Sequence, residues 1–112
     1  MKLIKDKISL AELGQMSQNM YGGMVKAVVD IEKRIMVVDA EMHADEEQFL
    51  LEQGSEQKDL WGINIYPGES VENRIEFDSM INIRPSRGNK SRTVENTDIQ
   101  KKIIALVNTF IE

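Results

Sequence analysis

The amino-acid sequence predicts an α+β domain, in which one four-stranded, mainly antiparallel sheet carries three helices on one face. Apolar residues alternate with polar ones along several stretches, which is typical of strands. Two other stretches begin with a capping box, a signature of a helix N-terminus. Short connections join the strands in pairs, which favours antiparallel neighbours. The predicted order is helix, hairpin, helix, hairpin, helix, and the 112 residues form a single domain, 1–112.

The first helix is predicted at residues 10–20. Ser9 and Glu12 have the spacing of a capping box, in which the hydroxyl of Ser9 accepts from the amide of Glu12 and the carboxylate reaches back. An apolar stripe at helical spacing follows, from Leu10 to Met20. Gly22 and Gly23 favour the end of the helix.

The first hairpin combines a β-branched strand at 25–31, a turn at 32–34 and a long alternating strand at 35–44. A period of two places the side chains of Asp39, Glu41 and His43 on one face of that second strand. Residues 44–53 are rich in helix formers, begin with acids and precede Gly54, so a short second helix is predicted there. The alternative is a strand that continues through Phe49-Leu50-Leu51.

The second hairpin is predicted from strands at 60–66 and 74–84. Trp61 lies on an apolar face of the first of these strands, and Asn64 and Tyr66 lie on its polar face. In the second strand, Glu76 and Asp78 lie opposite the apolar positions, and Pro85 ends the alternation. A capping box at Thr97–Gln100 begins the last helix, at about 98–111.

Composition excludes several classes of protein. A hydrophobic content of 41% is too high for a disordered tail. The absence of cysteine excludes a disulfide scaffold, a thiolate zinc site and a cysteine nucleophile. The sequence has neither a membrane-spanning apolar run nor the apolar core of a secretory signal, so a cytoplasmic location is expected. A net charge of −5 disfavours a nucleic-acid partner, because phosphate neutralisation requires a basic face.

The first candidate site is the polar side of the predicted strand 35–44. Its side chains project in one direction, about 6.5–7 Å apart, and Glu76 and Asp78 join them if the fourth strand lies nearby. Carboxylates with one imidazole suit Mn²⁺, Fe²⁺ or Zn²⁺ and also suit acid–base catalysis. The wet face of an antiparallel sheet produces the same row without any ligand, so no metal and no cofactor is expected. The catalytic candidates are His43, Asp45 and Asp78, and the metal candidates are Asp39, Glu41 and His43.

The second candidate site is the basic loop from Arg84 to Arg92. Glycine and asparagine in this loop tolerate the left-handed backbone that turns amides toward an anion, and arginine forks onto carboxylate or phosphate. A solvated loop is the alternative, because the sequence has no P-loop spacing. The ligand-binding candidates, for which a small anion is a possible ligand, are Arg84, Arg87, Asn89, Arg92, Tyr66 and Asn64.

Charge is segregated along the chain. Residues 39–59 contain eight acids and one base, whereas residues 84–92 contain four bases and no acid. The two segments are either separate solvated surfaces or partners that pair within a chain or between subunits.

Four stretches resemble a family of small uncharacterised prokaryotic proteins: 24–30, 42–46, 59–67 and 75–92. The resemblance covers nearly the whole chain. It implies a domain of unknown function, mostly bacterial and usually a stand-alone protein, and it assigns no residue a role.

Two hypotheses about function follow. The first is a non-enzymatic module that binds a protein partner or associates with itself as a homo-oligomer, since the sequence carries no recognisable catalytic motif. The second is a small-molecule or metal-dependent enzyme that uses His43, Asp45 and Asp78, with an anion contact from Arg84 or Arg87. The relative positions of His43, Asp78 and Arg84 discriminate between the two hypotheses.

Overall fold

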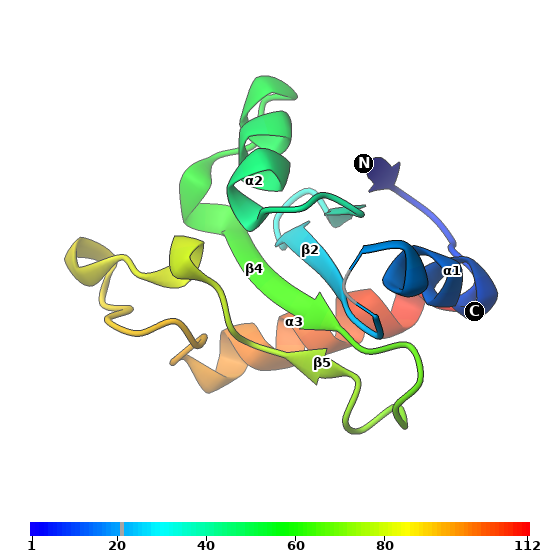
Figure 1. The fold of residues 1–112 in the computed structure, drawn as a ribbon. Helices are drawn as coiled ribbons and strands as arrows, with labels where there is room; N and C mark the ends of the chain where they lie inside the picture. The colour runs from blue at the N-terminus through cyan, green and yellow to red at the C-terminus, as the bar shows by residue number, and fades with distance from the viewer. Residues whose placement is uncertain (21) are drawn as a thin grey trace.

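A computed structural model describes residues 1–20 and 22–112 and contains a five-stranded antiparallel sheet of order β1-β3-β2-β4-β5 (Figure 1). The strands are β1 (Lys2–Ile4), β2 (Val25–Asp30), β3 (Ile35–Val38), β4 (Leu60–Ile65) and β5 (Ile75–Glu76). The α+β class and the antiparallel pairing are confirmed, but the predicted number of strands was one too low. The prediction missed β1, which has only three residues and pairs with β3 along its whole length.

All three predicted helices are present: α1 (Leu10–Met20), α2 (His43–Glu52) and α3 (Thr97–Phe110). The alternative of a strand through Phe49-Leu50-Leu51 is therefore wrong. The Ser9 hydroxyl accepts from the amide of Glu12 at 3.0 Å, as the capping box predicts. The prediction of a second capping box at Thr97–Gln100 is wrong. The side chain of Asn96, and not that of Thr97, caps α3 by accepting from the amides of Asp98 and Ile99.

The helices cover both faces of the sheet, not one face as predicted. The larger core lies between the sheet and helices α1 and α3, where Leu13, Ile63 and Val107 are buried. A smaller core of Val28, Val37, Leu50 and Leu60 lies on the opposite face, under α2 (Figure 1). Strand β2 is consequently buried on both sides along most of its length. No helix in the described part of the chain is long and apolar enough to cross a membrane.

The predicted strand 35–44 is wrong beyond residue 38. Asp39 adopts φ of 71°, which leaves the extended region and ends β3. The chain then turns, and the amide of Ala40 donates to the Glu46 carboxylate at 3.2 Å. Helix α2 begins at His43, so the alternating pattern at 39–43 belongs to a turn and not to a strand face.

The predicted strand 74–84 is also wrong, because only Ile75 and Glu76 pair with β4. Beyond them the chain forms two 3-10 turns, Met80–Asn82 and Pro85–Arg87, and side chains complete the edge of β4. The Asn82 amide group both accepts from the Gly62 N–H and donates to the Gly62 carbonyl, each at 2.9 Å. Arg84 donates to the carbonyl of Leu60, and His43 donates to that of Ile63.

Asn89 orders the loop that follows. Its side-chain amide donates to the carbonyls of Asn82, Ser91 and Thr93, and its oxygen accepts from the amide of Glu95. All its hydrogen-bonding groups are therefore engaged by the backbone, and it is buried. Asn89 therefore holds the loop in place through its side chain.

Candidate functional site

A pocket of about 430 Å³ lies where the N-terminus of α2 meets the sheet. Its floor is one row of side chains across three strands, since Lys26 pairs with Asn64 and Asn64 pairs with Glu76 in the strand register. Paired residues of neighbouring strands project from the same face. This row lies on the α2 face of the sheet, beyond the apolar residues that α2 covers. We call it the His43 pocket, after the residue that α2 contributes to its wall.

His43 is buried in the first turn of α2 and has a defined orientation. Its Nε2 lies 2.8 Å from the carbonyl oxygen of Ile63. Because a carbonyl only accepts, the neutral ring carries its proton on Nε2 and keeps a lone pair on Nδ1. Burial lowers the pKa of His43 and outweighs the hydrogen bond to Ile63, which raises it. The imidazole is therefore neutral at pH 7.

Asn64 organises the acidic side of the floor. Its Nδ2 donates to Glu76 Oε1 at 2.8 Å and to the backbone carbonyl of Asp78 at 3.2 Å, which fixes the orientation of the amide group. The Tyr66 hydroxyl donates to the same Glu76 oxygen at 3.0 Å. Burial and the neighbouring Glu76 raise the pKa of Tyr66, so the phenol stays protonated. The buried Oδ1 of Asn64 meets no donor at good hydrogen-bond geometry among the described residues, although the Asn64 side chain lies near enough to His43 to contribute to raising the pKa of that ring.

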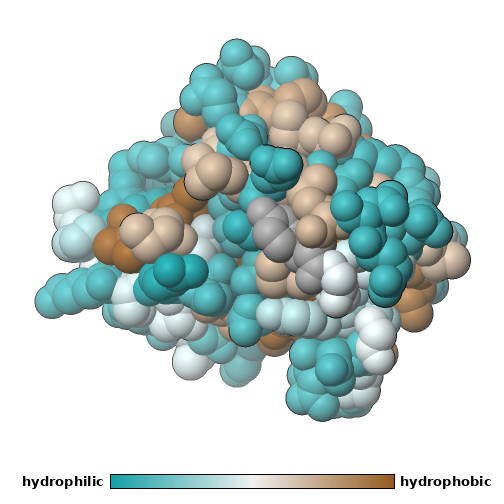
Figure 2. All heavy atoms as spheres, in the orientation of Figure 1, coloured by the Kyte–Doolittle hydropathy of each residue, from teal (hydrophilic) through white to brown (hydrophobic). Residues whose placement is uncertain are grey.

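The pocket contains charges of both signs and an apolar rim. Arg92 Nε donates to Asp78 Oδ1 at 2.6 Å, and Lys26 is the second cation. Met42 and Met80 line the pocket with side chains that are 58% and 64% exposed. Figure 2 shows the face of the molecule seen in Figure 1 as mainly hydrophilic, with apolar side chains in separate small groups. Exposed methionines at a polar cavity are adaptable contact surfaces.

The structure brings five of the predicted site residues together and separates the others. The His43 pocket is lined by His43, Asp78, Asn64, Tyr66 and Arg92. Asp45 is exposed on α2 outside this lining, and Asp39 and Glu41 lie in the turn before α2. No group of three or more metal-ligating side chains in the described ranges is placed to hold a metal ion, so the three metal candidates do not form a site.

Arg84, Arg87 and Asn89 line a different pocket, of about 440 Å³. Arg84 is buried, and its Nε donates to the carbonyl of Ile81 at 3.1 Å. Its Nη2 lies 3.6 Å from Glu47 Oε2, so one ion pair joins the acidic and basic segments within the chain. Arg84 does not line the pocket that contains His43 and Asp78, so the anion contact that the enzyme hypothesis assigns to Arg84 lies outside that pocket.

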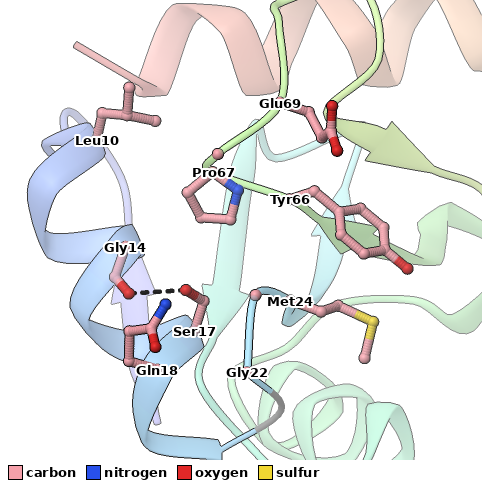
Figure 3. A pocket seen from close by; sticks show the side chains of 11 residues that line it. Leu10, Gly14, Ser17, Gln18, Gly22, Met24, Tyr66, Pro67 and Glu69 are labelled. Carbon is pink, nitrogen blue, oxygen red and sulfur yellow. Dashed lines mark hydrogen bonds between the residues drawn. The ribbon is translucent and has the colours of Figure 1, made fainter.

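A third hollow, of about 510 Å³, lies beside the His43 pocket and shares Met24 and Tyr66 with it. Figure 3 shows it between α1 and the turn at Pro67, with the Tyr66 and Met24 side chains pointing away from α1. Its one drawn hydrogen bond joins Ser17 to the carbonyl of Gly14 within α1, at 2.7 Å. Glu69 and Tyr66 are its only titratable lining residues among those described, so this hollow offers less chemistry than its neighbour.

Two features of the site were missed by sequence reasoning. Lys26 was assigned to a strand without a role, although a lysine within the apolar run 25–31 was a signal. Glu46 was counted only among the acids at the start of the predicted helix, but it is fully buried, and burial raises its pKa to about 9. Glu46 is therefore protonated at neutral pH, and its role is to hold the turn before His43 through Ala40.

Comparison with known proteins gives a family but no function. The chain matches the model of a family described as "Protein of unknown function (DUF5674)" over residues 2–110. No curated protein and no solved structure matches it. The match spans nearly the whole chain, which confirms the resemblance to a family without an assigned function. The chain belongs to the DUF5674 family of proteins of unknown function.

Proposed function

We propose that this domain is a small-molecule-binding module whose site is the His43 pocket, and that its ligand presents an amine or hydroxyl group to the pocket floor. The observation that carries the proposal is the buried Oδ1 of Asn64, an acceptor in a residue that lines the pocket, which has no donor at good hydrogen-bond geometry and interacts only weakly with His43. A buried polar group that makes no hydrogen bond is costly, and a bound donor removes that cost.

Other groups at the floor also accept hydrogen bonds. Glu76 and Asp78 contribute carboxylates, and His43 contributes the lone pair of Nδ1. Lys26 and Arg92 oppose this preference, but the charge of Arg92 is already neutralised by Asp78 at 2.6 Å. The two cations and the two carboxylates of the lining balance each other, so the preference rests on hydrogen bonding: a donor group such as an amine or hydroxyl meets acceptors at Asn64, His43 and Glu76.

The size and rim of the pocket suit a small amphipathic molecule. A volume of about 430 Å³ lies within the usual range of ligand pockets, roughly 300–1,000 Å³. The methionine side chains at the rim contact the apolar part of such a molecule, while the floor orients its polar end.

The proposal is tested by titrating the protein with ethanolamine, which carries both an amine and a hydroxyl, and with acetate as the opposite case. We expect saturable NMR shifts of the Asn64 and Glu76 amide signals with ethanolamine only. Asp78→Asn should weaken binding about threefold, equivalent to roughly 0.7 kcal/mol. Asp45→Asn makes the same charge change outside the pocket and should leave binding unchanged. Absence of saturable shifts in the pocket with ethanolamine contradicts the proposal.

The second candidate function is an enzyme in which His43 is the general base. In this reaction a ligand O–H or N–H transfers its proton to His43 Nδ1, and the imidazolium that forms is stabilised by the negative charge of Asp78, which raises the pKa of His43. Because His43 is the only histidine, diethylpyrocarbonate tests whether Nδ1 is reachable and neutral. We expect one modified ring per chain at pH 7 and none in His43→Gln. An unmodified wild-type protein excludes this candidate.

Self-association remains a prediction from the segregated charges. An ion pair between Arg84 and Glu47 satisfies part of this charge within one chain. A dimer held by the remaining charges dissociates as ionic strength rises, because salt screens exposed pairs. Light scattering that shows a monomer at every salt concentration contradicts self-association.

A further inference from the structure

We propose that the pocket around Arg84 is a second ligand site, which takes a small anion bearing a carboxylate or phosphate group. It is separate from the His43 pocket and does not depend on the function proposed there. The residues on which the argument rests are Lys58, Trp61, Arg84, Arg87, Asn89 and Glu95.

The first argument is the pair of unpartnered donors at this pocket. Arg84 and Trp61 are 8% and 6% exposed, and both line the pocket. Arg84 Nη1 and Trp61 Nε1 are buried and make no hydrogen bond with the described residues. Both groups can only donate, because neither a guanidinium nor an indole N–H has a lone pair to offer. A ligand that relieves them is therefore an acceptor.

The second argument is charge. Lys58, Arg84 and Arg87 bring three cations to the pocket, against the single lining carboxylate of Glu95. Glu95 is held by the Lys90 amide at 2.9 Å and the Ser91 hydroxyl at 2.6 Å, so its negative charge is directed into its own loop. These hydrogen bonds lower the pKa of Glu95 and keep it ionised. Glu47 lies 3.6 Å from Arg84 and offsets part of that residue's charge.

The third argument is that two of the cations have room to engage a ligand. Arg87 is exposed and forms no ion pair within the described ranges. Lys58 makes only long contacts, at 4.0 Å to Glu56 and 3.9 Å to Asp59. Flexible exposed cations beside a fixed buried guanidinium are an arrangement that binds carboxylate or phosphate oxygens.

The fourth argument is that the walls are rigid before a ligand arrives. The Arg84 guanidinium carbon lies 4.9 Å from the centre of the Trp61 ring, so the two unpartnered donors are stacked together. Asn89 fixes the backbone of the loop through its four hydrogen bonds, and Gly88 adopts a left-handed conformation with φ of 84°. A preformed site loses less conformational entropy on binding.

Trp61 makes the test direct, because it is the only tryptophan and its fluorescence reports on this pocket. The protein is titrated with inorganic phosphate and, separately, with acetate, at constant ionic strength set by chloride. We expect a saturable change in Trp61 emission with at least one of the two anions. Saturation with phosphate alone identifies a phosphate ligand, and saturation with acetate alone identifies a carboxylate ligand.

Three variants distinguish specific anion binding in the Arg84 pocket from non-specific attraction of anions to a basic surface. Arg87→Gln and Lys58→Gln alter exposed side chains, so the fold is retained, and each should weaken binding at least fivefold. Arg92→Gln removes the same charge from the other pocket and should have no effect. A linear, non-saturating response to both anions, or an equal loss in Arg92→Gln, overturns the proposal.

Discussion

The His43 pocket and the Arg84 pocket differ in what their buried groups lack. In the His43 pocket the unpartnered group is an acceptor, Asn64 Oδ1, whereas in the Arg84 pocket the unpartnered groups are two donors, Trp61 Nε1 and Arg84 Nη1. The same strand, β4, supplies Asn64 on one face and Trp61 on the other. Unsatisfied buried groups thus give each pocket a chemical preference that total charge does not reveal.

Both pockets depend on the way side chains replace a strand at the edge of β4. The side chains of His43 and Arg84 donate to the carbonyls of Ile63 and Leu60. The side chain of Asn82 hydrogen-bonds to both the N–H and the carbonyl of Gly62. Helix α2 connects the two sites, because His43 lies in one pocket and Glu47, one turn later, pairs with Arg84 of the other. A change in this edge therefore affects both pockets, and a change beyond it affects only one.

The largest effect on the free energy of unfolding is expected from a substitution of Gly62, which would disturb both pockets. A Cβ at this position would lie 2.5 Å from both Cβ and Oγ of Ser79, so Ser79 and the backbone around it must move. Gly62→Ala should lower the free energy of unfolding by about 3 kcal/mol, as overpacking of a core does. Urea unfolding measures the change.

The control for Gly62→Ala is Gly14→Ala in α1, where an added Cβ has no atom within 4 Å. Alanine is the better helix former, so this variant should gain roughly 0.5–1 kcal/mol. A neutral Gly62→Ala contradicts the view that close packing of Ser79 against β4 holds both pockets.

The edge of β4 also shows what the sequence could and could not predict. The three helices and strands β2 and β4 follow from local signals, namely periodicity and β-branched runs, which act over a few residues. The alternation at 74–84 is equally clear but does not form a strand beyond Glu76, because Asn82 and Arg84 make the hydrogen bonds that a strand backbone would make. Side chains that replace the hydrogen bonds of a strand backbone across a long sequence separation give no signal in the local sequence pattern.

The candidate site was predicted in its residue types and not in its geometry. His43, Asp78, Asn64, Tyr66 and Arg92 do line one pocket, although His43 reaches it from a helix and not from a strand. The division between two pockets was not predictable, since Arg84 and Arg92 are close in sequence and both basic. Only the fold shows that Arg92 pairs with Asp78 while Arg84 stacks on Trp61.

The second largest effect is expected at Glu46, which supports the turn before the His43 pocket. Its pKa of about 9 lies above its ordinary value of 4.5. A raised carboxyl pKa gives stability that is complete below pH 4.5 and is lost as pH rises toward 9, at up to about 1.4 kcal/mol per pH unit. Glu46→Gln cannot ionise, so it should flatten this decline and raise the free energy of unfolding at pH 8 by about 2 kcal/mol.

The expected gain in free energy of unfolding for Glu46→Gln is smaller than the pH dependence of the wild-type protein alone implies. The buried side-chain amide of glutamine adds N–H groups that need hydrogen-bond partners. Denaturant unfolding between pH 5 and pH 9 measures both the slope and the offset. Glu52→Gln, at an exposed position in the last turn of α2, serves as the control and should leave the slope unchanged. A wild-type protein with equal stability at pH 5 and pH 9 contradicts a neutral Glu46.

A smaller effect is expected at Glu47, where a substitution should change ligand affinity at the Arg84 pocket and not at the His43 pocket. Glu47→Gln removes the carboxylate 3.6 Å from Arg84 Nη2 and leaves that guanidinium with more of its charge. We expect phosphate or acetate binding at the Arg84 pocket, read from Trp61 fluorescence, to strengthen about threefold, or roughly 0.7 kcal/mol. Ethanolamine binding at the His43 pocket should not change, and weaker anion binding contradicts an anion contact at Arg84.

The smallest effect is a shift in the titration of His43, which tests the electrostatics of one pocket alone. Burial lowers its pKa from the ordinary value of 6.5, whereas Asp78 raises it, so Asp78→Asn should lower the pKa further. NMR follows this single histidine directly, and Arg87→Gln, in the other pocket, should leave it unchanged. Because the folded-state pKa is depressed, stability from this group is present above pH 6.5 and declines as pH falls below it. A pKa above 6.5 would mean that charge and not burial dominates at His43, and the ring would then enter the pocket as a cation and not as an acceptor.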